Sequence, residues 1–158
     1  MNRRADPLEL RAREMAIAAG VDPETHDGRD LWVVRKGATP AFPGQRGFVG
    51  GSMGDDAMII EGVDGPEAKT ALYSTVHGAG RLFGRNQARR TFTYRQMDEW
   101  LRERGVLVSG GDLDESPMAY RRLPDVLAHH AGSVKVLHTL RPFAVAMAGA
   151  GEFDPFRD

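Results

Sequence analysis

The 158-residue chain contains no cysteine. Disulfides, a thiolate nucleophile and cysteine metal ligands are therefore excluded within it. No stretch approaches the roughly 20 apolar residues of a membrane span. No apolar run follows Arg3 and Arg4, so the N-terminus does not have the pattern of a secretory signal. These absences predict a cytoplasmic protein with no membrane partner.

The chain also lacks a net positive charge, because its 21 Lys and Arg residues are balanced by 22 Asp and Glu residues, giving a formal net charge of −1. A general basic field for nucleic acid is missing, so any RNA partner must be bound by local positive charge. Apolar residues make up 41% and charged residues 27% of the chain, as in ordinary globular proteins. At this length we predict a single domain over residues 1–158.

Glycine is plentiful, with 19 residues, and it is concentrated locally in two clusters, Gly50-Gly51-Ser52-Met53-Gly54 and His77-Gly78-Ala79-Gly80. Around these clusters the patterns predict helices over residues 6–20, 66–73 and 81–90, and a helix that is capped by Thr93 and Gln96 and stopped by Gly105. Strands are predicted over residues 31–34, 58–60 and 134–140, the last with alternate residues buried. The mixture predicts an α+β fold with glycine-rich nucleotide-binding loops.

The glycine clusters have the chemistry of an anion site. Backbone without bulky side chains can turn sharply and bring its N–H groups close to a ligand. The second cluster directly precedes the predicted helix over residues 81–90, and a helix N-terminus favours phosphate. Arg81, Arg85 and Arg89 would form one stripe on that helix, and Lys36 adds a further cation. We therefore predict a phosphate or nucleotide site with His77 at its edge.

Each of these features also has a structural interpretation. Glycine loops are common, and an arginine stripe at helical spacing is usually a solvated face. His138 on a strand and the pair His129-His130 near a helix end are typical of structural or surface histidines. No His-x-x-x-His, Cys-x-x-Cys or carboxylate cluster at metal spacing is present.

Four segments, in this order, resemble the RtcB family of RNA-splicing ligases. They are Arg35-Lys36-Gly37-Ala38-Thr39-Pro40-Ala41, Gly51-Ser52-Met53-Gly54, Ser74-Thr75-Val76-His77-Gly78-Ala79-Gly80-Arg81 and Asp114-Glu115-Ser116-Pro117-Met118-Ala119-Tyr120-Arg121. The similarity covers residues 31–150, whereas residues 1–22 match poorly. The resemblance identifies the chain as the C-terminal portion of a divergent member of that family.

The resemblance implies a GTP- and manganese-dependent enzyme. It would join an RNA 3′-phosphate or 2′,3′-cyclic phosphate end to a 5′-hydroxyl end in RNA splicing or repair, through a GMP-histidine intermediate. By resemblance His77 is the nucleophile, and the GMP site is formed by Gly50, Gly51, Ser52, Met53, Gly78, Ala79, Gly80 and Tyr120. Lys36, Arg81 and Arg85 match positions linked to phosphate or RNA. We expect the two glycine segments to lie side by side, with His77 facing the pocket between them. Arg81 and Arg85 should point toward the same cleft as His77, whereas Arg89 and Arg90 should be solvated.

The chain departs from the family pattern at several positions. Met147 stands where the family has a lysine that contacts guanine, and Ala57 stands where a serine is frequent. The upstream aspartate, cysteine and histidine metal ligands are missing, and His26 is a weak candidate for the last of them. We therefore expect the isolated chain to be inactive, as a fragment or one half of a split ligase that needs an upstream half. The alternatives are a non-catalytic RNA- or nucleotide-binding remnant and a structural partner subunit of a full-length ligase.

Overall fold

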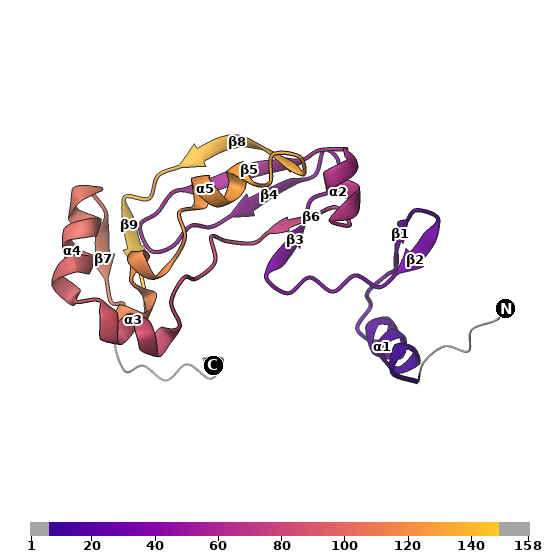
Figure 1. Cartoon of the computed structure of the whole chain (residues 1–158), viewed down its shortest axis with the longest axis horizontal. Coiled ribbons are helices and arrows are strands. Elements are labelled where there is room, and N and C mark those ends of the chain that lie inside the picture. Colours follow the sequence, from indigo (N-terminus) through magenta and orange to yellow (C-terminus); the bar gives the residue numbers. More distant parts are fainter. Residues whose placement is uncertain (1–6, 149–158) are drawn as a thin grey trace. The chain divides into compact units, whose positions relative to one another are not determined.

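A computed structural model describes residues 7–148 of the chain (Figure 1). Two compact units are distinguished, one ending at Lys36 and the other beginning at Gly37, and each is described by itself. The expectation of a single domain stays a prediction. Helices and strands are mixed in the described residues, so the predicted α+β class is confirmed. None of the described helices has the length and apolar character needed to cross a bilayer.

The first unit consists of helix α1 (Pro7–Ala18) and a hairpin of β1 (Glu24–His26) and β2 (Arg29–Leu31). The predicted strand over residues 31–34 is therefore wrong, because the strand ends at Leu31. Asp27 and Gly28 form the turn with φ of 49° and 72°. Positive φ at both central residues is what a tight two-residue hairpin requires, and Asp-Gly is the pair that supplies it.

A three-stranded antiparallel sheet forms the centre of the second unit, in the order β4-β5-β8. Its strands are β4 (Arg46–Val49), β5 (Ala57–Gly62) and β8 (Val134–Leu140), which confirms the strands predicted over 58–60 and 134–140. The predicted alternation along β8 is wrong, since Val136, His138 and Leu140 are all exposed. β8 is an edge strand of this sheet, and a register shift opposite Ile59 and Ile60 breaks the alternation.

The main core lies between this sheet and helix α5 (Leu123–Ala128), whose Leu123 and Leu127 pack against buried strand residues. The cluster consists of Ala41, Val49, Met58, Ile60, Ala79, Leu123, Leu127 and Val134. Beside it, β3 (Ala38–Pro40) pairs antiparallel with β6 (Ser74–Val76), the strand that leads into His77. Helix α2 (Pro66–Thr70) is shorter than the predicted 66–73, because Leu72 and Tyr73 adopt positive φ.

A second core cluster, Met53, Met97, Leu101 and Val106, packs helix α4 (Tyr94–Glu103) against the loop that follows β4. The predicted capping box is confirmed, since the Thr93 side chain accepts from the Gln96 N–H and the Gln96 side chain accepts from the Thr93 N–H. Beyond Gly105, β7 (Leu107–Ser109) pairs in parallel with β9 (Ala144–Ala146). This cluster therefore fixes one side of the first glycine segment.

The segment after His77 differs from the prediction of a helix over residues 81–90. Helix α3 begins only at Arg85 and ends at Thr91, after Gly84 at its N-cap. Arg81 instead forms an isolated bridge with Tyr120. Two 3-10 helices, η1 (Leu113–Glu115) and η2 (Pro117–Ala119), lie between β7 and α5, and η1 contacts α3. The helix N-terminus expected directly after Gly80 is thus not formed there.

Candidate functional site

The two glycine segments meet in the second unit. Gly50 and Gly78 form a parallel bridge, so the residue after His77 lies beside the start of the first segment. The two segments are 28 residues apart in the sequence, and each follows a strand, β4 or β6. The expected side-by-side placement is confirmed.

Two glycines in the first segment are required by geometry. A side chain at Gly51 would place its Cβ 2.3 Å from the Asp56 carbonyl oxygen, which belongs to the same turn. Gly54 has a φ of 72°, and its Cβ would lie 2.5 Å from a methyl group of Leu101. The chain between β4 and β5 can therefore fold tightly only with glycine at these positions.

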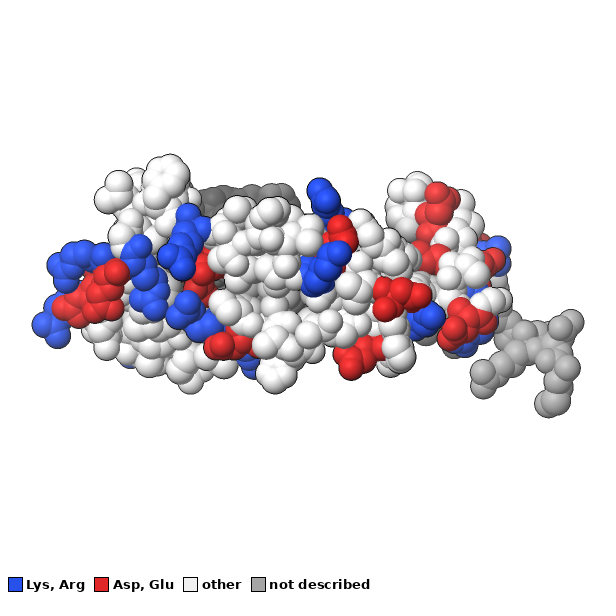
Figure 2. All heavy atoms as spheres, turned by 90° about the horizontal axis from the view of Figure 1, so that it is seen from above, with Lys and Arg blue, Asp and Glu red and all other residues white. Residues whose placement is uncertain are grey.

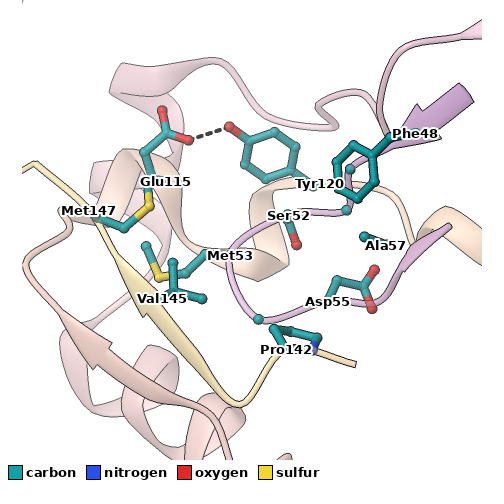
Figure 3. Close-up of a pocket in the computed structure, with 13 residues that line it drawn as sticks. Phe48, Ser52, Met53, Asp55, Ala57, Glu115, Tyr120, Pro142, Val145 and Met147 are labelled. Atoms are coloured by element: carbon teal, nitrogen blue, oxygen red, sulfur yellow. Dashed lines mark hydrogen bonds between the residues drawn. The ribbon is translucent and has the colours of Figure 1, made fainter. Parts of the chain in front are cut away.

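A cavity of about 350 Å³ opens beside this turn (Figure 3). Its volume is within the range of small-molecule sites in proteins. The lining residues come from the turn, from η1 and η2, and from the segment around β9: Phe48, Gly50, Gly51, Ser52, Met53, Gly54, Asp55, Ala57, Glu115, Tyr120, Pro142, Val145 and Met147. Five of the predicted nucleotide-binding residues are among them, namely Gly50, Gly51, Ser52, Met53 and Tyr120. Gly78, Ala79 and Gly80 are not, and Ala79 belongs to the main core.

His77 is exposed, and it directly follows β6. Its backbone N–H donates to the Gly37 carbonyl at 3.5 Å. Its ring faces the same residue, since a Cβ on Gly37 would lie 3.9 Å from Nε2 and Cδ2. His77 is not among the residues that line the cavity, so the expectation that its side chain faces the cavity is not met. It lies on the neighbouring segment, joined to the cavity wall through Gly78 and Gly50.

The predicted arginines are held by a cluster of acidic residues on and beside η1. Arg81 donates to the Asp114 carbonyl, and at 2.5 Å to the Tyr120 hydroxyl. Arg85 forms ion pairs with Glu115 and, at 3.1 Å, with the fully buried Asp114. These contacts do not touch His77, so a shared orientation toward His77 is not observed.

Arg89 was expected to be solvated, and this is wrong. Its guanidinium pairs with Asp112 at 3.1 Å and with Asp114 at 3.2 Å. Arg90 is exposed, as expected. The arginine stripe therefore lies against carboxylates from η1 and the residue before it, an arrangement that neither the anion-site nor the solvated-face interpretation predicted.

The cluster changes the acidity of its members. Burial raises the pKa of the Tyr120 hydroxyl to about 12, and its hydrogen bond to Glu115 adds to the rise. Burial works against ionisation of Asp112, but hydrogen bonds from the Leu113 N–H, Tyr94 and Arg89 outweigh it, so the Asp112 pKa is lowered. Burial likewise opposes the charge on Arg85, yet Asp114 and Glu115 raise its pKa overall. At neutral pH Asp112 and Arg85 are therefore charged, whereas the Tyr120 hydroxyl keeps its proton.

Two predicted residues lie in the first unit, and their roles stay predictions. Lys36 is its last residue and is exposed. His26 is buried, and its Nε2 pairs with Glu24 at 2.9 Å. Within residues 7–148 no group of three or more His, Cys, Asp or Glu side chains is placed to hold a metal ion.

Four further residues line the cavity but were given no role from the sequence: Phe48, Asp55, Glu115 and Val145. Asp55 is buried and accepts from Arg122 Nε at 3.0 Å, which fixes the turn to the start of α5. Glu115 lay within the quoted Asp114–Arg121 segment, so a signal for it was present. Phe48 and Val145 gave none, because only the tertiary fold brings them to the cavity.

Comparison with known proteins finds one family to which the chain is similar. A family model described as tRNA-splicing ligase RtcB matches residues 19–148. The RNA-splicing ligase RtcB of Escherichia coli K12 is 36% identical over 124 residues, which are 77% of this chain and 29% of that protein. The tRNA-splicing ligase RtcB of Aeropyrum pernix is 34% identical over 136 residues, 74% of this chain and 28% of that protein. The tRNA-splicing ligase RtcB of Thermococcus kodakarensis is 34% identical over 141 residues, which cover 76% of this chain and 29% of that protein. The chain thus spans less than a third of the length of these relatives.

Proposed function

Because the chain belongs to the RtcB family of tRNA-splicing ligases, we propose that it carries the nucleotide pocket and the nucleophile of a GTP-dependent RNA ligase. The enzyme joins an RNA 3′-phosphate or 2′,3′-cyclic phosphate end to a 5′-hydroxyl end. The observation that supports this best is the Gly50–Gly78 bridge. It brings a cavity of suitable size next to the segment that bears an exposed histidine.

The proposed chemistry begins with attack by a neutral nitrogen of His77 on the α-phosphorus of GTP. The N–P bond forms, the α–β phosphoanhydride bond breaks, and pyrophosphate leaves. A 2′,3′-cyclic phosphate end is first opened by water, which attacks its phosphorus, breaks the P–O2′ bond and leaves a 3′-phosphate and a 2′-hydroxyl. An oxygen of the RNA 3′-phosphate then attacks the phosphorus of the GMP-histidine, and the N–P bond breaks, which frees His77. Finally the 5′-hydroxyl attacks the activated 3′-phosphate, loses its proton and displaces GMP. Each step exchanges one bond to phosphorus for another.

In these reaction steps, the residues of this chain would position the reactants. Phosphoryl transfer depends mainly on holding the reactants in line and neutralising charge. The exposed position of His77 leaves its ring accessible to a triphosphate, while the glycine backbone allows close approach of N–H groups. Lys36, Arg81 and Arg85 are the proposed contacts to phosphate or RNA.

The family implies manganese, and the described residues of this chain do not form a site for it. His26 is engaged with Glu24 in the first unit and has no third ligand among the described side chains. We derive no step through the metal. The proposal instead assigns metal binding to an upstream ligase half, consistent with the small share of the relatives that this chain covers.

The test is covalent labelling with α-³²P-GTP in the presence of manganese. The chain alone should form no stable adduct, and adding the upstream part of a family member should produce labelling. His77→Ala should abolish that labelling, while His138→Ala, which alters an exposed histidine on β8, should leave it unchanged. Labelling that survives His77→Ala would refute the assignment of the nucleophile.

The same experiment distinguishes the second candidate, a non-catalytic RNA- or nucleotide-binding remnant that acts as a partner subunit. The engagement of Arg81 and Arg85 by Asp114 and Glu115 favours it, because these arginines are already partly neutralised. A remnant would bind GMP or RNA, but α-³²P-GTP would not label it even after the upstream part of a family member is added.

A further inference from the structure

The cavity offers a bound base few side-chain hydrogen-bonding partners, because the carboxylates and the phenol of its lining are already engaged. Asp55 is only 4% exposed, and both of its carboxylate oxygens accept from Arg122 Nε, at 3.0 and 3.1 Å. One of them also accepts from the Leu123 N–H at 3.3 Å. This carboxylate therefore supports the turn rather than presenting a free acceptor to a ligand.

Glu115 is engaged in the same way at the opposite wall. One carboxylate oxygen accepts from Arg85 and, at 3.5 Å, from Arg81, and the other accepts from the Tyr120 hydroxyl. The Tyr120 hydroxyl in turn accepts from Arg81. Neither the carboxylate nor the phenol is left with the paired free atoms that bidentate recognition of a base edge needs.

Ser52 is the remaining polar side chain of the lining, and its hydroxyl makes no hydrogen bond to the described residues. A hydroxyl can either donate or accept. It can therefore satisfy the acceptor of one purine or the donor of another, and it gives no preference between them.

The other side chains of the lining are apolar. Figure 3 shows the Phe48 and Tyr120 rings toward one end of the cavity and Met53, Val145 and Met147 toward the other. Phe48 is 59% exposed although it is a large aromatic residue, and its ring edge would lie 3.6 Å from a Cβ on Gly50. An exposed ring over a glycine backbone is a surface on which a planar base can stack.

Guanine and adenine differ in the hydrogen-bond donors and acceptors of one base edge, and the side chains of this cavity make few hydrogen bonds to that edge. Guanine presents an acceptor O6 and donors at N1 and N2, whereas adenine presents a donor N6 and an acceptor N1. Sites that reject one of two similar ligands strongly do so through buried polar groups that the wrong ligand leaves unpaired. We propose that this cavity holds a purine base by stacking and shape and discriminates little between guanine and adenine. The inference rests on the proposed function, because that function places the nucleotide in this cavity.

The test is calorimetric titration of the full chain with GMP and with AMP. The two dissociation constants should agree within about threefold. Phe48→Ala should weaken both by at least about fivefold, as expected for loss of one stacking contact. Phe143→Ala removes an exposed ring outside the cavity and should change neither.

A gain-of-preference variant makes the test independent of folding defects. Met147→Lys would place an ammonium on the cavity wall, where it can donate to O6 and N7 of guanine but opposes the amino group of adenine. It should create at least a tenfold preference for GMP. Ala146→Lys adds the same charge at an exposed neighbour outside the lining and should leave the ratio unchanged.

The outcomes separate the inference from the proposed function. A preference for GMP of tenfold or more in the unmodified protein would overturn the inference and leave the ligase proposal standing. Dissociation constants for both nucleotides that do not change with Phe48→Ala would show that the nucleotides bind elsewhere, and this result would overturn the inference as well. No binding of either nucleotide would overturn the inference together with the proposed nucleotide pocket, whereas the labelling experiment tests His77 separately.

Discussion

Replacing Asp114 by asparagine should destabilise the second unit by about 2–3 kcal/mol. The Asp114 side chain is fully buried and pairs with Arg85 at 3.1 Å and with Arg89 at 3.2 Å. Hydrogen bonds to charged groups contribute roughly 1.5–3 kcal/mol each. The two arginine side chains are 37% and 34% exposed, so solvent screens the pairs and compensates the arginines when the carboxylate is lost. The expected loss is therefore below the sum of the two bonds.

The assay is urea unfolding followed by the fluorescence of Trp100, in a Trp32→Phe background so that only the second unit reports. The midpoint should fall while the slope with urea stays constant, because the exposed surface on unfolding is unchanged. Asp98→Asn, which alters an exposed carboxylate on α4, is the matched control and should cost less than about 0.5 kcal/mol.

Replacements of Arg85 and Arg89 should not combine additively. Arg85→Ala or Arg89→Ala alone leaves the other guanidinium beside Asp114, whereas the double variant removes both of these guanidinium groups from a buried carboxylate. The double variant should therefore lose more stability than the sum of the single variants. Additive losses, or an Asp114→Asn variant as stable as the control, would refute the idea that this carboxylate holds the arginines.

Three further results are expected. Gly54→Ala should lose about 2–4 kcal/mol in urea unfolding, because a Cβ meets Leu101 at 2.5 Å and φ is 72°, whereas Gly84→Ala, with open space and negative φ, should lose less than about 1 kcal/mol. Thr93→Ala should lose about 1 kcal/mol with the capping box of α4, and a cost near zero in the same assay would contradict the observed cap. Burial raises the pKa of Tyr120 to about 12 from 10.0, so the stability due to Tyr120 is fully present below pH 10 and is lost as pH rises toward 12. Unfolding measured at pH 9 and pH 11 should show this loss, and Tyr120→Phe should diminish it.

Local features of the fold were predictable because neighbouring residues determine them. The capping box at Thr93 and the apolar run of β5 were both found from the sequence, since each depends on contacts within a few residues. The hairpin at Asp27-Gly28 also has a local turn signal, because Asp-Gly is a pair typical of two-residue hairpin turns. The early start assigned to α3 failed because Arg81 pairs with Tyr120, 39 residues away, and no local pattern records that contact.

The candidate site was only partly predictable for the same reason. The two glycine segments were found from the clustering of glycine, and Tyr120 through family resemblance; five of the predicted nucleotide-binding residues line the cavity. The opposite wall, with Val145 and Met147, comes from the segment around β9, and its place depends on the parallel pairing of β7 and β9. Sequence spacing contains no information about that pairing, so the apolar character of the wall appears only in the folded chain.

The arginine stripe shows most clearly what periodicity leaves open. Spacing of four residues places side chains on one face of a helix, but that face can meet water, a phosphate or carboxylates of the same chain. Among the described residues, Arg81, Arg85 and Arg89 meet Asp112, Asp114 and Glu115, so these six side chains together carry no formal surplus of positive charge. Lys and Arg residues also lie close to Asp and Glu residues on the face that Figure 2 shows. A phosphate that binds there must share guanidinium groups already held by these acids. Arg81 and Arg85 keep 24% and 37% of their side chains exposed, so part of each side chain remains accessible to a ligand. Binding of RNA phosphate by these two arginines is therefore compatible with their ion pairs, but it draws on hydrogen bonding and local geometry rather than on net charge.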